Sequence, residues 1–99
     1  MTSPNILELA VCTITDKDAA LAARERAMQA VSRYPGFVSW RALTACETAD
    51  MIADLVAWES LEAAQAAGKR VLTDPDFAPY MAAIGSVKLM QHFVTEQQI

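Results

Sequence analysis

Apolar residues alternate with other residues in four short stretches of the chain, and this spacing predicts β-strands. The predicted strands cover residues 6–14, 37–46, 51–58 and 87–95. Apolar positions recur three and four residues apart over residues 17–34 and 61–72, which predicts two amphipathic helices. A shorter helix, interrupted by Pro79, is expected to end at Gly85.

Polar residues and glycines mark the ends of these helices. Asp16 or Thr15 can accept a hydrogen bond from the first turn of the first helix, and Ser60 can do so for the second. Gly36 ends the first helix. Gly68 lies on the apolar side of the second helix, where we expect it to let the helix approach the sheet closely.

The order of these elements is strand, helix, two strands, helix, strand, which predicts an α+β fold of the ferredoxin-like βαββαβ type. Its four strands form one antiparallel sheet in the order 4-1-3-2, with the helices on one face because crossover connections are right-handed. Apolar residues occupy both faces of the strands, yet the helices can cover only one. A second copy of the chain would cover the other face, so we expect a homodimer that forms a dimeric α+β barrel.

The composition narrows the class of protein further. The chain of 99 residues is long enough for one small domain, residues 1–99. Its net charge of -4 argues against nucleic acid as a partner, and it lacks the run of about 18 apolar residues that spans a membrane. The first five residues have no signal-peptide character, which predicts a cytoplasmic protein. Two cysteines, Cys12 and Cys46, and one histidine are too few for a usual zinc site, so we expect reduced, packed thiols and no metal.

Three short motifs together point to a family. They are Tyr34-Pro35-Gly36-Phe37, Trp58-Glu59-Ser60-Leu61-Glu62-Ala63-Ala64 and Asp74-Pro75-Asp76-Phe77-Ala78-Pro79-Tyr80. With them, the chain from Ile6 to Thr95 resembles the antibiotic biosynthesis monooxygenase (ABM) family of dimeric α+β barrels. The resemblance implies the barrel fold but several activities, because that family includes oxygenases of aromatic polyketides that use no metal or flavin and also haem-degrading enzymes.

The haem-degrading activity is not expected here. Haem-degrading members share an asparagine on the first strand, a tryptophan on the second main helix and a histidine on the short helix. This chain has Ala66, Ala67 and Gly68 in that helix and Met81 near the histidine position. The resemblance therefore implies a protein that works without a cofactor.

Polar residues gather on one alternating set of strand positions, namely Glu8, Ser39, Arg41, Asp54, Lys88 and His92. In the expected strand order, Arg41 and Asp54 lie on neighbouring strands, and so do Glu8 and His92. These residues can be cross-strand ion pairs that only stabilise the sheet, or they can line a pocket. In the second case, His92 is the candidate catalytic base because its ordinary pKa lies near neutrality, with Arg41 as a second catalytic candidate.

Four further residues are candidates for a binding pocket, with Glu8 and Asp54. Trp40 and Trp58 could wall an aromatic pocket, and Tyr80 could bind a substrate oxygen, although such residues more often pack in the core. Arg24 falls among apolar helix positions, where it could meet an acidic ligand or extend its guanidinium past the sheet edge.

Two functions fit these observations. The first is a cofactor-independent monooxygenase, or a related enzyme, acting on an aromatic or polyketide-like small molecule. The alternative is a non-catalytic dimeric barrel that binds a small apolar molecule. An enclosed cavity that reaches His92, Arg41 or Tyr80 would favour the enzyme, and a fully packed interior would favour the alternative.

Overall fold

The computed structural model describes residues 5–99, and its elements follow the predicted order. The strands in this range are β1 (Ile6–Ile14), β2 (Phe37–Thr44), β3 (Met51–Trp58) and β4 (Ile84–Val94). The helices are α1 (Lys17–Val31), α2 (Leu61–Arg70) and α3 (Ala78–Ala83), and the 3₁₀ turn η1 (Val71–Thr73) follows α2. Four of the five residues on which we based the expected lack of a signal peptide lie outside the described residues.

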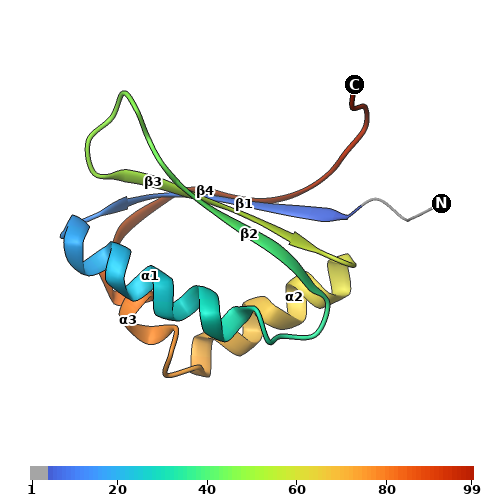
Figure 1. Cartoon of the computed structure of the whole chain (residues 1–99), viewed down its shortest axis with the longest axis horizontal. Coiled ribbons are helices and arrows are strands. Elements are labelled where there is room, and N and C mark those ends of the chain that lie inside the picture. Colours follow the sequence, from blue (N-terminus) through green and yellow to red (C-terminus); the bar gives the residue numbers. More distant parts are fainter. Residues whose placement is uncertain (1–4) are drawn as a thin grey trace.

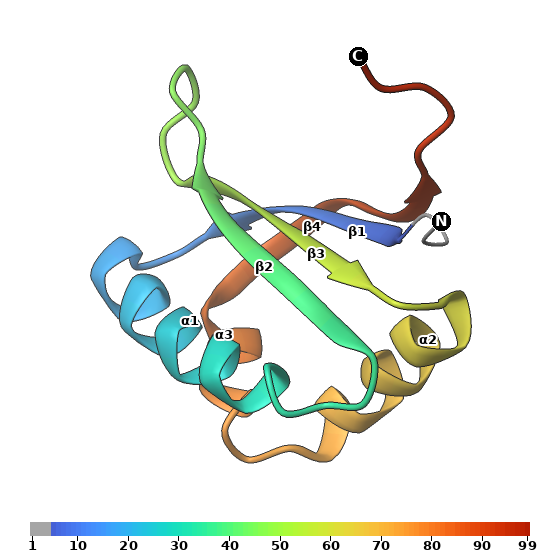
Figure 2. The ribbon, with the colours of Figure 1, turned by 45° about the vertical axis from the view of Figure 1, so that its right-hand side comes forward.

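One antiparallel sheet carries the fold. Its strands run in the order β2-β3-β1-β4, as predicted, and every neighbouring pair is antiparallel. Figure 1 shows the helices together on one side of this sheet, and Figure 2 shows the other side without a covering layer. The predicted α+β, ferredoxin-like arrangement is therefore confirmed.

The ends of the helices and strands show which local sequence signals predicted them correctly. Asp16 accepts a hydrogen bond from the N–H of Ala19 at 3.2 Å and Ser60 accepts one from Ala63 at 3.1 Å, so both expected N-caps are present. Gly85, in contrast, does not end a helix. It belongs to β4, which begins earlier than predicted because Ile84 already pairs with the end of β1.

A bulge near the start of β2 changes which of its side chains face the helices. Phe37 pairs with Trp58 and Ser39 pairs with Ala57, the residue before Trp58 in β3, so Val38 is an extra residue without a partner in the ladder. After the bulge, Trp40 rather than Arg41 shares the helix-covered face with Asp54. The prediction that Arg41 lies on the same face as Asp54 is therefore wrong.

The core lies between the sheet and the helices in two adjoining clusters. One contains Cys12 and Ile52 of the sheet with Tyr80 of α3, and the other contains Val56 and Trp58 with residues of α1 and α2. Cys12 is buried, as expected. Cys46 was expected to be packed as well, but β2 ends at Thr44 and this cysteine is exposed.

The face of the sheet away from the helices is also rich in apolar side chains, as the alternation predicts. The ladder pairs Leu7 with Phe93, Leu9 with Leu55 and Val11 with Leu89 on this face, which we call the open face. Leu89 is 40% exposed and Phe93 is 44% exposed. Exposed apolar surface of this kind is typical of a protein interface.

Candidate functional site

A cavity of about 430 Å³ lies between the helix-covered face of the sheet and α2, η1 and α3. Most of its lining is apolar, as in small-molecule sites, which fix an apolar ligand with a few polar groups. The polar groups come from β1, β2, β3 and α3. They belong to Glu8, Trp40, Asp54, Trp58 and Tyr80.

Asp54 is the centre of a buried polar network on one wall of the cavity. Its carboxylate accepts hydrogen bonds from the hydroxyl of Tyr80 and, at 2.9 Å, from the indole N–H of Trp40. Arg24 Nε lies 3.0 Å from the same carboxylate, and both residues are buried. The guanidinium of Arg24 also donates to one backbone carbonyl of β2 at 3.1 Å and to one of β3 at 3.3 Å. Because each charge has a partner, this network rigidifies the wall.

Tyr80 stays a neutral hydrogen-bond donor in this network. Burial raises the pKa of its phenol, and the neighbouring Asp54 carboxylate raises it further. The position of Arg24 therefore differs from both of the positions that the sequence predicted for it. It neither reaches past the sheet edge nor is free for an acidic ligand, because it neutralises Asp54 inside the fold.

Glu8 is the second ionisable group of the cavity and has a different environment. Burial raises the pKa of its carboxyl, whereas the neighbouring His92 acts in the opposite sense. His92 Nε2 approaches the Glu8 carboxylate to 3.4 Å, as the strand order predicts, but makes no aligned hydrogen bond to the described residues. A carboxyl with a raised pKa in an apolar cavity is a stronger base than an exposed carboxylate and is a candidate for proton transfer.

Trp58 presents a poorly hydrogen-bonded donor in the same cavity. Trp58 is only 2% exposed, and its indole N–H makes no well-aligned hydrogen bond within residues 5–99. The indole nevertheless lies close enough to the Glu8 carboxyl to lower its pKa, so the two groups face one point of the cavity. A ligand oxygen bound there could complete the hydrogen bonding of this donor.

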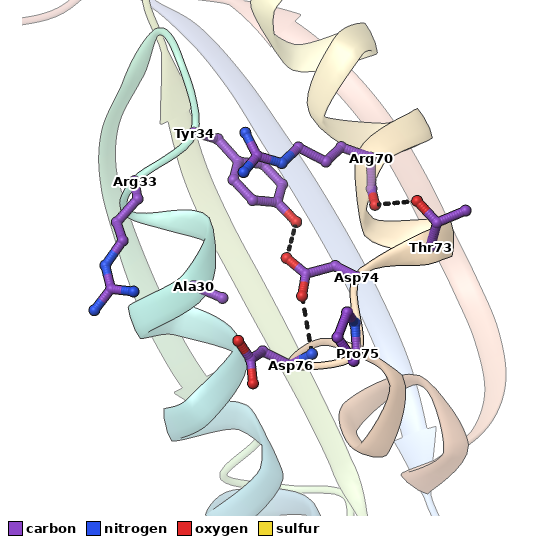
Figure 3. A pocket seen from close by; sticks show the side chains of 8 residues that line it. All are labelled: Ala30, Arg33, Tyr34, Arg70, Thr73, Asp74, Pro75 and Asp76. Carbon is purple, nitrogen blue, oxygen red and sulfur yellow. Dashed lines mark hydrogen bonds between the residues drawn. The ribbon is translucent and has the colours of Figure 1, made fainter.

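A second, more open cavity of about 370 Å³ lies between the end of α1 and the connection from α2 to α3 (Figure 3). The hydroxyl of Tyr34 donates to Asp74, whose other carboxylate oxygen accepts from the N–H of Asp76 at 2.8 Å. The guanidinium of Arg70 lies 4.1 Å from the centre of the Tyr34 ring. Burial and the adjacent Asp74 raise the pKa of Tyr34 to about 12. These contacts are satisfied among themselves, so they anchor the connection to α1.

Two kinds of structural element were sought among residues 5–99, a cluster of metal-ligating side chains and a membrane-spanning helix. No group of three or more His, Cys, Asp or Glu side chains among residues 5–99 is arranged to hold a metal ion. In the same part of the chain, no helix combines the length and apolar character needed to span a bilayer.

Comparison with solved structures gives a clear result for the fold. SnoaB from Streptomyces nogalater, described as a cofactor-independent oxygenase, superposes in its N63A form with a TM-score of 0.79. The two sequences are 18% identical, and the match covers 98% of each chain. The chain has the fold of the ABM proteins.

Other solved structures extend the ABM likeness beyond SnoaB. A candidate antibiotic biosynthesis monooxygenase from Bordetella bronchiseptica has a TM-score of 0.76 at 16% identity, over 98% of this chain and 99% of that one. One from Chloroflexus aurantiacus has a TM-score of 0.72 at 17% identity, over 96% of each chain. No family model and no curated protein matches the sequence. The likeness predicted from the three motifs is thus confirmed as an ABM fold.

Within this ABM fold, the structure brings together most of the residues singled out from the sequence. Five of them line the cavity directly, while His92 lies beside Glu8 and Arg24 behind Asp54. Arg41 is exposed on the open face, opposite Leu55, and does not reach the cavity. Cys12 also lines the cavity and was not among the predicted site residues, although it alternates in phase with Glu8 on β1 and this phase could have revealed it.

Proposed function

We propose that this protein is a cofactor-independent oxygenase acting on an aromatic or polyketide-like molecule that carries an ionisable hydroxyl group. The observation that carries the proposal is the pairing of Glu8, a carboxyl of raised pKa, with the adjacent indole N–H of Trp58, which makes no well-aligned hydrogen bond within residues 5–99, in one mostly apolar cavity. The fold of SnoaB, a cofactor-independent oxygenase, supports the reaction class.

Glu8 and Trp58 have different roles in the proposed reaction. A substrate oxygen accepts a hydrogen bond from Trp58, and Glu8 takes a proton from the substrate, leaving a delocalised carbanion or phenolate. This electron-rich anion reduces O₂ by forming a carbon–oxygen bond at a carbon of the ring system that still carries a hydrogen. The peroxide anion formed takes up a proton to give a hydroperoxide. The hydroperoxide then loses its C–H hydrogen as a proton and its outer oxygen as hydroxide, which leave together as water, and the carbon becomes a carbonyl. One oxygen atom stays in the product and the other leaves as water, so no external reductant is consumed.

His92 has a supporting place in this proposal. It lies 3.4 Å from the Glu8 carboxylate and is partly exposed, so it can stabilise the charged carboxylate or pass its proton towards solvent. Glu8 rather than His92 is then the group that contacts the substrate. Arg41, on the open face, has no part in the reaction.

The test uses aromatic hydroquinones and fused-ring phenols, with oxygen consumption and product absorbance as readouts. Glu8→Gln should lower kcat about 100-fold or more, because general base catalysis contributes at least that much. The rate of the unaltered protein should rise with pH through the raised pKa of Glu8, since only the carboxylate accepts a proton. Glu62→Gln, an exposed carboxylate of α2 outside the cavity, is the matched control and should leave the rate unchanged. Oxygen consumption within twofold of normal in Glu8→Gln would exclude Glu8 as the base.

A non-catalytic binding barrel remains the second candidate, and one observation favours it. The polar network around Asp54 is satisfied internally, which suits a rigid binding wall as well as a reactive one. Tight binding of a fused-ring phenol without oxygen consumption would support this alternative over the enzyme.

We expect the protein to be a homodimer joined through the open face. Light scattering should give twice the mass of one chain, because pairing buries apolar side chains that a monomer exposes. Leu89→Glu, on the open face and 40% exposed, should shift the protein towards monomer. Leu21→Glu is a matched control, since Leu21 is 37% exposed but lies on α1. A stable folded monomer at micromolar concentration would rule the dimer out.

A further inference from the structure

Gly68 is a helix-interior glycine that the packing does not explain. It lies in the last turns of α2, where glycine weakens a helix relative to alanine. A Cβ atom built at this position would meet nothing within 4 Å, so the expectation that Gly68 allows close approach to the sheet is wrong. Its φ angle is not positive either, because within residues 5–99 Gly36 is the glycine with that conformation.

Gly68 instead lies at the opening of the cavity, because it both lines the cavity and is exposed to solvent. The same opening is bordered by large apolar side chains that are also exposed. Leu72 is 68% exposed and Val87 is 59% exposed, and Met81 and Met90 complete the border. An apolar border at a cavity mouth fits a ligand whose outer part is apolar.

The inner end of the cavity indicates how such a ligand is oriented. The buried indole of Trp58 faces Glu8, makes no well-aligned hydrogen bond within residues 5–99 and lines the same cavity as Gly68. A ligand oxygen bound to this donor fixes one end of the molecule near Glu8, and the remainder extends towards the opening. The ligand's length beyond the oxygen then decides whether it reaches α2.

We propose that Gly68 is the position that sets the size of ligand this cavity accepts, because its missing side chain leaves room for the outer ring of a fused-ring molecule. The inference rests on the proposed function for the chemical class of the ligand and adds its size. Small one-ring molecules bound at Trp58 and Glu8 do not need to extend as far as Gly68. A side chain larger than methyl at position 68 enters the opening and excludes the longer molecules.

The experiment measures binding of three probes, phenol, 1-naphthol and 1-anthrol, by equilibrium dialysis under nitrogen. Gly68→Leu should weaken 1-anthrol binding about tenfold or more and change phenol binding by less than about twofold, with 1-naphthol between them. Both Gly68→Leu and Gly68→Ala should fold, since leucine and alanine favour helix over glycine, and Gly68→Ala should raise Tm by about 5 °C. Ala66→Leu is the matched control, because Ala66 is exposed on the same helix outside the cavity lining, and it should bind all three probes normally.

Three outcomes would overturn the inference. They are unchanged 1-anthrol binding in Gly68→Leu, an equal loss for all three probes, and failure of the unaltered protein to bind any of them. Because the measurement excludes oxygen, it separates this inference from the oxygenase proposal. Size selection without turnover in air would support the role of Gly68 and reject the oxygenase. Turnover in air without size selection would support the oxygenase and reject the role of Gly68.

Discussion

Asp54→Asn should lower the free energy of unfolding by about 3–5 kcal/mol, the usual cost of breaking a buried ion pair. Tyr80 and Trp40 donate to different carboxylate oxygens, so Asn keeps an acceptor for only one of them, and it also removes the charge that Arg24 faces. The guanidinium of Arg24 is only 5% exposed and cannot turn to water without opening the fold. Urea unfolding monitored by circular dichroism measures the change.

The matched control is Asp76→Asn. Asp76 also pairs with an arginine, Arg26, at 2.7 Å, but both side chains are about half exposed. Exposed pairs of this kind contribute about 1 kcal/mol or less. The double variant Arg24→Met with Asp54→Leu should recover part of the lost stability, because it removes both charges. Equal effects of Asp54→Asn and Asp76→Asn would show that the pair around Asp54 is not effectively buried.

Gly36→Ala should cost about 3 kcal/mol, because strained backbone and overpacking each contribute on the order of 1–3 kcal/mol. Gly36 has a φ angle of 80°, a backbone conformation that is energetically unfavourable for alanine. A Cβ atom at this position would also lie 2.5 Å from the Cβ of Ala63 in α2. The backbone cannot move away easily, because the carbonyl of Gly36 accepts a hydrogen bond from Glu59 at 2.8 Å. Thermal unfolding should therefore show a much lower Tm.

Gly68→Ala is the comparison that makes this result specific. The substitution is chemically identical, but position 68 has no positive φ and no neighbouring atom in the way. It should stabilise the protein by about 1 kcal/mol through helix propensity. If Gly36→Ala and Gly68→Ala changed Tm in the same direction, the account of the turn at Gly36 would be wrong.

Local signals were enough to predict most of the fold. The caps at Asp16 and Ser60 and the alternation in the strands predicted the order of elements, and the ferredoxin-like arrangement that this order indicates predicted the strand order. The right-handed crossover rule placed the helices on one face of the sheet. Because β1 and β4 are neighbours in that order, the approach of His92 to Glu8 was also predictable.

The site residues that were predicted wrongly depend on geometry that the alternation of apolar residues does not contain. The bulge at Val38 breaks the two-residue period, so Trp40 and Arg41 exchange faces. The contact between Tyr80 and Asp54 joins α3 to the sheet, and strand pairing says nothing about where a short helix docks. Likewise, the sequence could not show whether Gly68 packs closely against the sheet or borders open space, because that depends on which side chains surround α2.

The bulge in β2 also bears on how proteins with this barrel diverge. In a strand of the same sequence without the bulge, the register that begins with Phe37 opposite Trp58 would continue unbroken and bring Arg41 opposite Asp54. The cavity wall would then gain a guanidinium and lose an indole, with no amino acid replaced. A shift of a single residue in strand pairing is thus a route by which related chains could change the molecules they accept, and aligning such chains by sequence alone would miss it.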